Sequence, residues 1–357
     1  MYQRKSRQCC AAMVIVSLLL RLCMMLGLDT LAASAVLDAA AKPEFARFML
    51  WLETGRVAYT PVPDTPSELW ILRWEQAAES AAPEDSSVPE ETALLPTALA
   101  KAGDIRVAGS CTYRTDTAAL LSRPSQLDLS GDGPKVLIVH THGTEAYTPS
   151  DGRTYAESGS WRTLEQDKSV VQVGTVLTET LEEFGVEVIH DTTLNDYPSY
   201  NLSYTNSLAR IQSWTARYPS LQMVIDLHRD AAQDAGGQAV ALSSNQQGES
   251  CAQLMLVVGT DQGGLPHPGW QENLANALKL QSVLEGMYPG LCRNIDLRTE
   301  RFNQHMTPGS ILVEVGVNGN TLTQAENSAR LLGEAIARMF GALSHTGGTL
   351  TAVSNGS

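Results

Sequence analysis

Two histidines and a glutamate fall within residues 140–145, whose sequence is His-Thr-His-Gly-Thr-Glu. Imidazole nitrogens and carboxylate oxygens are among the ligands that zinc takes from proteins, and a catalytic zinc ion keeps one position open for water or substrate. The stretch follows the apolar run 136–139, which is entered through Gly133 and Pro134 and is typical of a buried strand. These residues therefore predict part of a metal site at the end of a strand.

Two later stretches place the same kinds of side chain in apolar runs. His228 ends the run 223–228, and Glu314 interrupts the otherwise apolar run 311–315. A buried glutamate needs a partner or has a raised pKa, so it is rarely present for stability alone. Because ligands gather at the carboxyl ends of the strands in open parallel sheets, we expect these residues to meet there.

Together these side chains indicate a zinc hydrolase. We predict that His142, Glu145 and His228 bind zinc, and that Glu314 is the general base, which takes the proton of the attacking water and delivers it to the leaving amine. Asp167 is an alternative third ligand, although its position before a helix also indicates an N-cap. One histidine at a strand end is more often structural, but two of them with a buried glutamate favour a metal.

Other polar residues are predicted to orient the ligands or to bind substrate. His140 shares a strand face with His142 by the period of two, so it is an alternative metal ligand, although we favour a role in orienting a ligand or binding substrate. Asp226 and Asp230 lie on either side of His228 and are candidates for orienting imidazoles.

The loop 301–308 precedes the strand of Glu314, so we expect it to open on the same rim as the site. Its polar side chains are candidates for binding carboxylates or amides of a peptide. The full set assigned to substrate binding or to orienting the ligands is His140, Arg229, Asp230, Arg301, Asn303, Gln304 and His305.

Strands and helices alternate in the predicted folded part of the chain. This alternation predicts an α/β fold, with a mostly parallel sheet covered by helices on both faces. The predicted strands are 136–140, 186–189, 223–228, 254–258 and 311–315, and 239–242 is a further candidate. The predicted helices are 169–184, 202–217, 270–287 and 321–340.

The N-terminal part has a different character. Residues 9–28 form a twenty-residue apolar segment with Arg21 as its one charged side chain, and residues 1–8 before it are basic. Such a segment is long enough to span a bilayer, and its basic flank indicates a cytoplasmic N-terminus. A cleaved signal peptide, with its cleavage site at 33–35, is the alternative interpretation. We predict a cytoplasmic tip and transmembrane anchor (1–33), a juxtamembrane segment and acidic tether (34–104), a catalytic domain (105–342) and a flexible tail (343–357).

Charge and cysteine content argue against several classes of protein and of metal site. The formal net charge of −14 argues against a nucleic-acid partner, for which a basic patch is expected. The six cysteines include no Cys-x-x-Cys pair, so a thiolate zinc site or a thioredoxin-like motif is not expected.

With these residues in view, the chain resembles the stage II sporulation protein P family. The resemblance rests on an ordered series of motifs from about Gly133 to Phe340. They are 139–149, 190–193, 196–200, 226–231, 258–260, 272–274, 301–308 and 312–316.

The resemblance implies a membrane-anchored peptidoglycan hydrolase with an α/β amidase fold, similar to zinc-dependent N-acetylmuramoyl-L-alanine amidases. It implies cleavage of the bond between N-acetylmuramic acid and L-alanine, and a second, endopeptidase activity on cross-links. It implies that His142 and His228 match metal ligands of the family and that Glu314 matches its general base. The carboxylate ligand lies nearer Asp167 in the wider class of amidases, whereas the motif of this family keeps Glu145. It also implies work with stage II sporulation proteins D and M during engulfment, with the catalytic domain outside the mother-cell membrane, in the septal space.

Two other functions compete with this one. A degenerate amidase fold could bind peptidoglycan or a partner protein without cutting, but such a binder has no need for a general base. A generic secreted metallopeptidase would be expected to carry a His-Glu-x-x-His helix, which is absent from the sequence.

Overall fold

The structure is a computed structural model, and it describes residues 99–101, 103–150 and 152–350. The predicted transmembrane anchor and nearly all of the predicted tether lie outside these residues. Within the described part of the chain, no helix combines the length and the apolar character that crossing a membrane requires. The anchor at 9–28 therefore stays a prediction.

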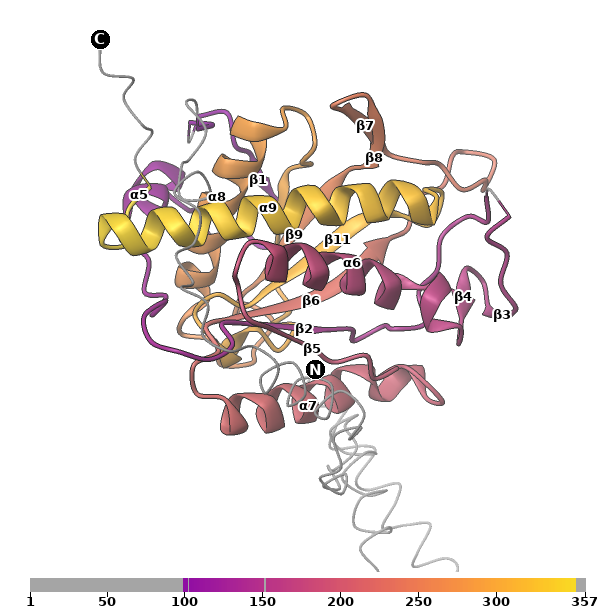
Figure 1. Ribbon diagram of the computed structural model, residues 1–357, viewed down its shortest axis with the longest axis horizontal. Coiled ribbons are helices and arrows are strands. Elements are labelled where there is room, and N and C mark those ends of the chain that lie inside the picture. The colour runs from indigo at the N-terminus through magenta and orange to yellow at the C-terminus, as the bar shows by residue number, and fades with distance from the viewer. Residues whose placement is uncertain (1–98, 102, 151, 351–357) are drawn as a thin grey trace, which may run out of the picture. The chain divides into compact units, whose positions relative to one another are not determined.

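A seven-stranded sheet lies at the centre of the described residues (Figure 1). In spatial order its strands are β1 (Val107–Ala108), β10 (Ile295–Arg298), β9 (Leu254–Gly259), β11 (Ile311–Val317), β6 (Met223–Asp230), β2 (Val136–Val139) and β5 (Val188–His190). All neighbouring strands are parallel except β11 and β9, which pair antiparallel. The prediction of an α/β fold with a mostly parallel sheet is confirmed.

Three helices cover one face of this sheet. They are α6 (Val170–Glu183), α8 (Trp270–Met287) and α9 (Leu322–Thr346). Strand side chains of alternate residues, such as Ile138, Ile225 and Val313, are fully buried in the core with these helices. Figure 1 shows α6 and α9 in front of the sheet.

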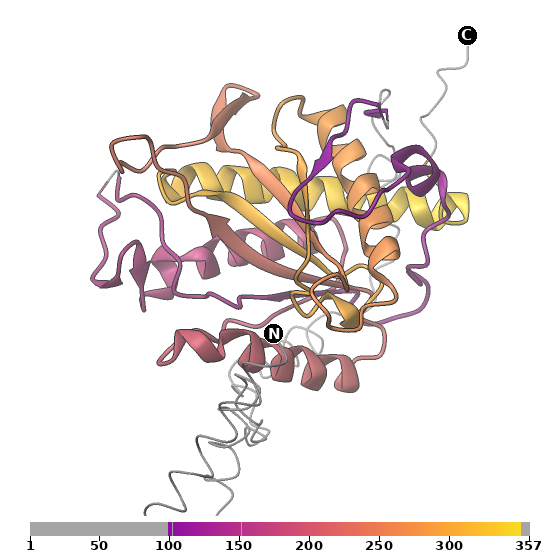
Figure 2. The same ribbon diagram turned by 180° about the vertical axis from the view of Figure 1, so that it is seen from behind.

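The opposite face is covered only in part. Helix α7 (Ser203–Arg217) packs through Ile211 on Leu137, Val139 and Val224 of β2 and β6. On β9 and β11, residues such as Met255 line an open cleft instead. Figure 2 shows the long strands in front of α9, with α7 below them. Helices on both faces were predicted, and among the described residues the second face is covered by α7 near β2 and β6, while the rest of it borders the cleft.

The remaining elements are short. Like β1 and β10, they were not predicted from the sequence. Runs of two to six residues are too brief to show a helical or strand period. They are α5 (Thr117–Ser122), the hairpin of β3 (Glu157–Gly159) and β4 (Arg162–Thr163), the hairpin of β7 (Ser243–Gln246) and β8 (Glu249–Ala252), and the 3₁₀ turns η2 (Gln166–Lys168), η3 (Tyr200–Leu202) and η4 (Gln304–Met306). The further candidate strand at 239–242 does not form.

Helix α9 begins where predicted and continues farther than predicted. Thr321 caps it through a capping box with Gln324, which satisfies backbone groups at both positions. Ala342 and Leu343 are buried, so the apolar stripe of the helix extends past 340. The helix therefore ends at Thr346, inside the segment that was predicted as a flexible tail.

Close packing of α9 on α6 gives a testable prediction. A Cβ atom at Gly333 of α9 would lie 2.9 Å from both Cβ and Cγ2 of Thr180 on α6. We expect Gly333→Ala to lower the free energy of unfolding by about 1–3 kcal/mol, because overpacking outweighs the better helix propensity of alanine. Chemical denaturation measures this change. Gly103→Ala, where nothing lies within 4 Å of the added Cβ, is the control, and an unchanged Gly333→Ala protein would contradict the prediction.

Candidate functional site

The turn after β2 is shaped by two buried carboxylates. Thr141 donates to Asp226 from its backbone N at 2.8 Å and from its Oγ1 at 2.6 Å. Thr144 donates to Asp196 from its backbone N at 3.2 Å and from its Oγ1 at 2.5 Å. Because these bonds bend the chain away from the strand direction, the alternation of strand side chains stops before His142.

His140 consequently does not share a face with His142, contrary to the expectation from the period of two. Its Nδ1 lies 3.0 Å from the carbonyl oxygen of Leu227, and its Nε2 lies 2.9 Å from Nε2 of His190. The pair packs on α6, where a Cβ at Gly174 would lie 2.7 Å from Nε2 of His140. Burial lowers the pKa of His140 to about 4 and that of His190 to about 3. Both rings are thus neutral and hold β2 to β5 and β6.

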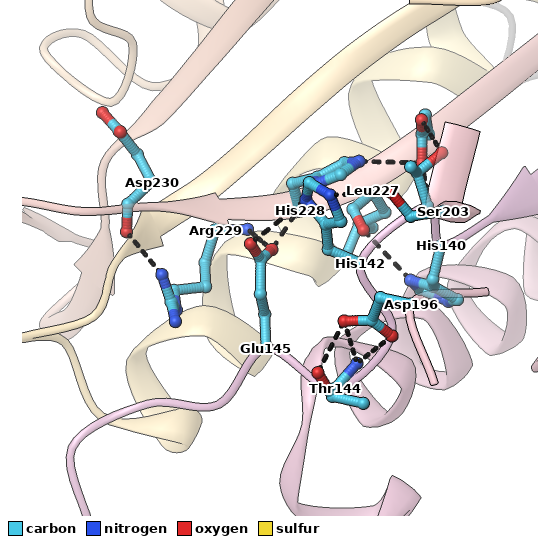
Figure 3. A network of polar contacts seen from close by, with 12 residues as sticks. His140, His142, Thr144, Glu145, Asp196, Ser203, Leu227, His228, Arg229 and Asp230 are labelled. Atoms are coloured by element: carbon cyan, nitrogen blue, oxygen red, sulfur yellow. Dashed lines mark hydrogen bonds and ion pairs between the residues drawn. The ribbon is translucent and has the colours of Figure 1, made fainter. Parts of the chain in front are cut away.

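Three predicted ligands meet at the end of β2 and β6 (Figure 3). Nδ1 of His142 lies 3.6 Å from Oε1 of Glu145, and Nδ1 of His228 lies 3.4 Å from Oε2 of the same carboxylate. One ligand atom from each of the three residues lies within 4.8 Å of the others. Two imidazoles and one carboxylate at this spacing are a donor set that suits zinc.

The other nitrogen of each imidazole also has a polar neighbour. Nε2 of His228 lies 2.9 Å from Oδ1 of Asp226, and Nε2 of His142 lies 3.2 Å from Oγ of Ser203. Such partners fix the orientation of histidines that bind metals. Burial alone would lower the pKa of His228, but the carboxylates of Asp226 and Glu145 raise it well above its usual value.

Glu145 is held by cationic and polar groups on several sides. Burial alone would raise its pKa, but hydrogen bonds from His142 and His228 hold the pKa well below its usual value. The backbone N of Arg229 also donates to its Oε2 at 3.2 Å. The side chain of Arg229 donates to the carbonyl oxygens of Ala146 and Trp161, each at 2.9 Å. Arg229 thus orients the site by holding the backbone of the turn that carries Glu145.

Arg162 and Tyr200 belong to the site and were not predicted. Nη2 of Arg162 lies 3.4 Å from Glu145 and its Nη1 lies 2.7 Å from Asp196. The guanidinium also lies 4.9 Å from the ring centroid of Tyr200, which stacks on His142 with centroids 4.6 Å apart. Tyr200 falls in the motif 196–200, but Arg162 lies in a two-residue strand without a pattern of its own.

Glu314 lies in the middle of β11, directly opposite His228 of β6. Its Oε2 is buried and has no hydrogen-bond partner among the described residues. Burial raises the pKa of Glu314 to about 8, although nearby His228 acts to lower it. A carboxyl group with a pKa near neutrality and no competing partner can exchange a proton with a molecule bound beside it.

Asp167 is separated from this cluster. Its side chain is 67% exposed and pairs with Nζ of Lys168 at 2.8 Å. It is also not the N-cap of α6, because Ser169 has that position and accepts a hydrogen bond from Val171. The alternative third ligand therefore lies outside the group of three residues that the structure brings together.

The loop 301–308 lies on a different rim from the one expected. Because β11 is parallel to β6, the loop before β11 lies at the beginning of β6, where the backbone N of Gly309 donates to the carbonyl oxygen of Gln222. Phe302 is the residue of this loop that lines the cleft.

The four loop residues assigned to substrate make contacts within the protein. Gln304 is buried between backbone groups of Val257 and Gly259, and Nδ2 of Asn303 donates to the carbonyl oxygen of Tyr204. Nη1 of Arg301 donates to the carbonyl oxygen of Pro266. Burial, with the nearby charge of Arg301, lowers the pKa of His305 to about 4. Their role in substrate binding stays a prediction.

The site opens into a cleft of about 870 Å³ on the uncovered half of the sheet. His142, Glu145, His228 and Glu314 line it, and so do Tyr200 and Tyr204 on η3 and α7. Asp230, at the end of β6, also lines the cleft and forms an ion pair of 2.8 Å with Arg293.

The contact of Asp226 with His228 gives a second prediction. We expect Asp226→Asn to weaken zinc binding by about 10–100-fold, because the imidazole loses the carboxylate that orients it and raises its basicity. Competition with a zinc-binding dye measures the affinity, and the thermal unfolding midpoint reports whether the protein is folded. Asp132→Asn, at an exposed position, is the control. Equal affinities of the two variants would contradict this role of Asp226.

Comparison with known proteins identifies relatives by sequence. The family model described as stage II sporulation protein P matches residues 73–337. The stage II sporulation protein P of Bacillus subtilis (strain 168) is 27% identical over 222 residues, which cover 59% of this chain and 52% of that protein. The match thus spans about half the length of that curated relative.

Two similar solved structures are amidases with low TM-scores. The N-acetylmuramyl-L-alanine amidase Ami1 from Mycobacterium smegmatis has a TM-score of 0.35 and 12% identity, over 59% of this chain and 98% of that one. The CwlD amidase from Clostridioides difficile, in complex with the GerS lipoprotein, has a TM-score of 0.34 and 15% identity, over 59% of this chain and 96% of that one. Likenesses of this size do not bear on the chemistry of the present site.

Proposed function

The chain belongs to the stage II sporulation protein P family, and from this premise we propose that it is a membrane-anchored, zinc-dependent peptidoglycan hydrolase. It cleaves the amide bond between N-acetylmuramic acid and L-alanine. One observation carries this proposal: Glu314, whose buried Oε2 has no hydrogen-bond partner among the described residues, lies opposite His228, beside the cluster that His228 forms with His142 and Glu145.

The residues of the cluster fit a zinc ion. Two imidazole nitrogens and a carboxylate oxygen lie within 4.8 Å of one another, and the second nitrogen of each imidazole already has a polar neighbour. His142, Glu145 and His228 would hold the ion. When bound, zinc supplies a Lewis acid that polarises a carbonyl group and makes water a better nucleophile at neutral pH.

Glu314 supplies the proton transfers that hydrolysis of an amide needs. Water adds to the carbonyl carbon and loses a proton, the C–N bond breaks, and the leaving nitrogen gains a proton. Glu314 accepts the first proton and returns it to the nitrogen, so the carboxylate is regenerated at the end of the reaction. Its burial supports this role, because it raises the pKa of Glu314 to about 8, close to neutrality.

The same geometry disfavours a protein that only binds peptidoglycan. A binding site gains nothing from a buried carboxyl group without a hydrogen-bond partner, because leaving such a group unpaired costs stability. Endopeptidase activity on cross-links, an extracytoplasmic location at the mother-cell membrane, and work with stage II sporulation proteins D and M are parts of the proposal that rest on family membership.

The proposal predicts the products of a digest. We expect the zinc-loaded protein to release stem peptides with a free N-terminal L-alanine from purified sacculi, and we expect a chelator to stop the release until zinc is added back. Mass spectrometry of the digest distinguishes these peptides from fragments cut within cross-links. Sacculi that stay intact with zinc-loaded protein would refute hydrolysis, and cross-link fragments alone would refute the amidase assignment.

Substitutions separate metal binding from proton transfer. We expect Glu314→Gln to keep about one zinc ion per chain and to lose activity by about 10²–10⁴-fold, because the amide cannot accept the proton. His142→Ala and His228→Ala should lose the metal itself. Elemental analysis and the digest assay measure the two properties, and Glu179→Gln on the exposed side of α6 is the control. A fully active Glu314→Gln enzyme would show that another group is the base.

A further inference from the structure

The cleft extends well beyond the four residues that the proposed reaction uses. It continues over β9 and β10, where Met255 and Val257 form part of its floor. Two arginines, Arg293 and Arg298, line this extension, one before β10 and one at its end. Hydrolysis needs only the space beside Glu314, so the extension is available to a chain segment that flanks the cleaved bond.

Arg293 is held in place by the carboxylate of Asp230, both of whose oxygens already accept a hydrogen bond. Nη1 of Arg293 donates to Oδ2 of Asp230 at 2.8 Å, while Oδ1 accepts from the backbone N of Ala231 at 2.8 Å. Among the described residues, the Arg293 side chain makes no other hydrogen bond or ion pair. Asp230 thus orients the guanidinium group and leaves its Nε and Nη2 for a ligand.

Arg298 has only long contacts with carboxylates. Its Nη1 lies 3.4 Å from Asp296 and its Nε lies 3.3 Å from Glu300. Charge-assisted hydrogen bonds are ordinarily about 2.7–2.9 Å, so these pairs are weakly formed. The guanidinium also lies 5.8 Å from the ring centroid of Phe302, and its Nη2 contacts no acceptor among the described residues. A ligand carboxylate can therefore approach this guanidinium as well.

Stability alone does not account for two arginines on this face. Ion pairs as exposed as these contribute little to folding, because water screens them and holding long side chains costs entropy. Charges on an outermost strand can prevent unwanted strand pairing, but β10 has β1 on one side and β9 on the other. An arginine with unpaired N–H groups in a cleft is suited to binding a carboxylate through two parallel hydrogen bonds.

We propose that Arg293 and Arg298 bind carboxylate groups of an acidic peptide, so that the peptide portion of the substrate lies over β9 and β10. This inference rests on the proposed function, because it assigns the peptide side of the same cleft. It makes the enzyme selective for stem peptides with free carboxylates over stem peptides in which these groups are amides.

Peptide binding to the full-length, zinc-loaded Glu314→Gln protein tests this without turnover. The probes are L-alanyl-γ-D-glutamyl-L-lysine, with both of its carboxylates free, and its analogue with both as carboxamides. We expect calorimetry to show at least tenfold tighter binding of the diacid. Arg293→Gln and Arg298→Gln, added singly, should each weaken diacid binding at least tenfold and leave diamide binding within twofold. Arg293→Lys, which keeps the charge and loses the planar fork, should behave like Arg293→Gln.

Arg330→Gln on α9 is the matched control, since this arginine is exposed and donates to Asn327. Equal binding of the two peptides, or no binding of either, would overturn the inference. If the arginine variants bound both peptides equally more weakly, the inference would also be overturned, because that result is expected if the arginines have a structural role. The sacculus digest by the unaltered protein is scored separately. Carboxylate-selective binding with intact sacculi would refute the proposed function alone, and digestion without selectivity would refute the subsite alone.

Discussion

Asp226 joins the two chain segments that form the site. Its carboxylate accepts two hydrogen bonds from Thr141, in the turn after β2, and lies 2.9 Å from His228 on the neighbouring strand β6. The first contact sets where the turn leaves the strand, and therefore where His142 and Glu145 lie. The second sets the ring orientation of His228. Because one buried carboxylate contacts both segments, it helps to place the three candidate ligands close together.

The cleft lies over the strands that α7 leaves uncovered, where the sheet also changes strand direction. Strands β5, β2, β6 and β11 share one direction, and β11 is followed in the sheet by antiparallel β9. Among the described helices, α7 is the one that packs on the second face, and its apolar contacts end at β2 and β6. Charged and polar side chains on β6, β10 and β11 therefore face a cleft and can act on a substrate that lies across the sheet.

Much of the candidate site was predictable because its residues follow strong local patterns. His142, His228 and Glu314 each lie in or next to an apolar run, so a polar side chain there is conspicuous in the sequence. Arg162 was not predictable, since it comes from a two-residue strand that pairs with Glu145 only in the folded chain. The face of His140 was predicted wrongly for a related reason. Hydrogen bonds from Thr141 to a residue 85 positions away end the strand alternation.

The sequence by itself determined the alternation of strands and helices, the residue types of the candidate ligands and the position of the proposed general base. These properties depend on residue type and short-range spacing, which act within one element. The tertiary structure alone decided which face stays open, which rim the loop 301–308 occupies and which arginines line the cleft. These depend on the order and direction of strands, because β10 and β11 meet their neighbours through contacts between segments far apart in the chain.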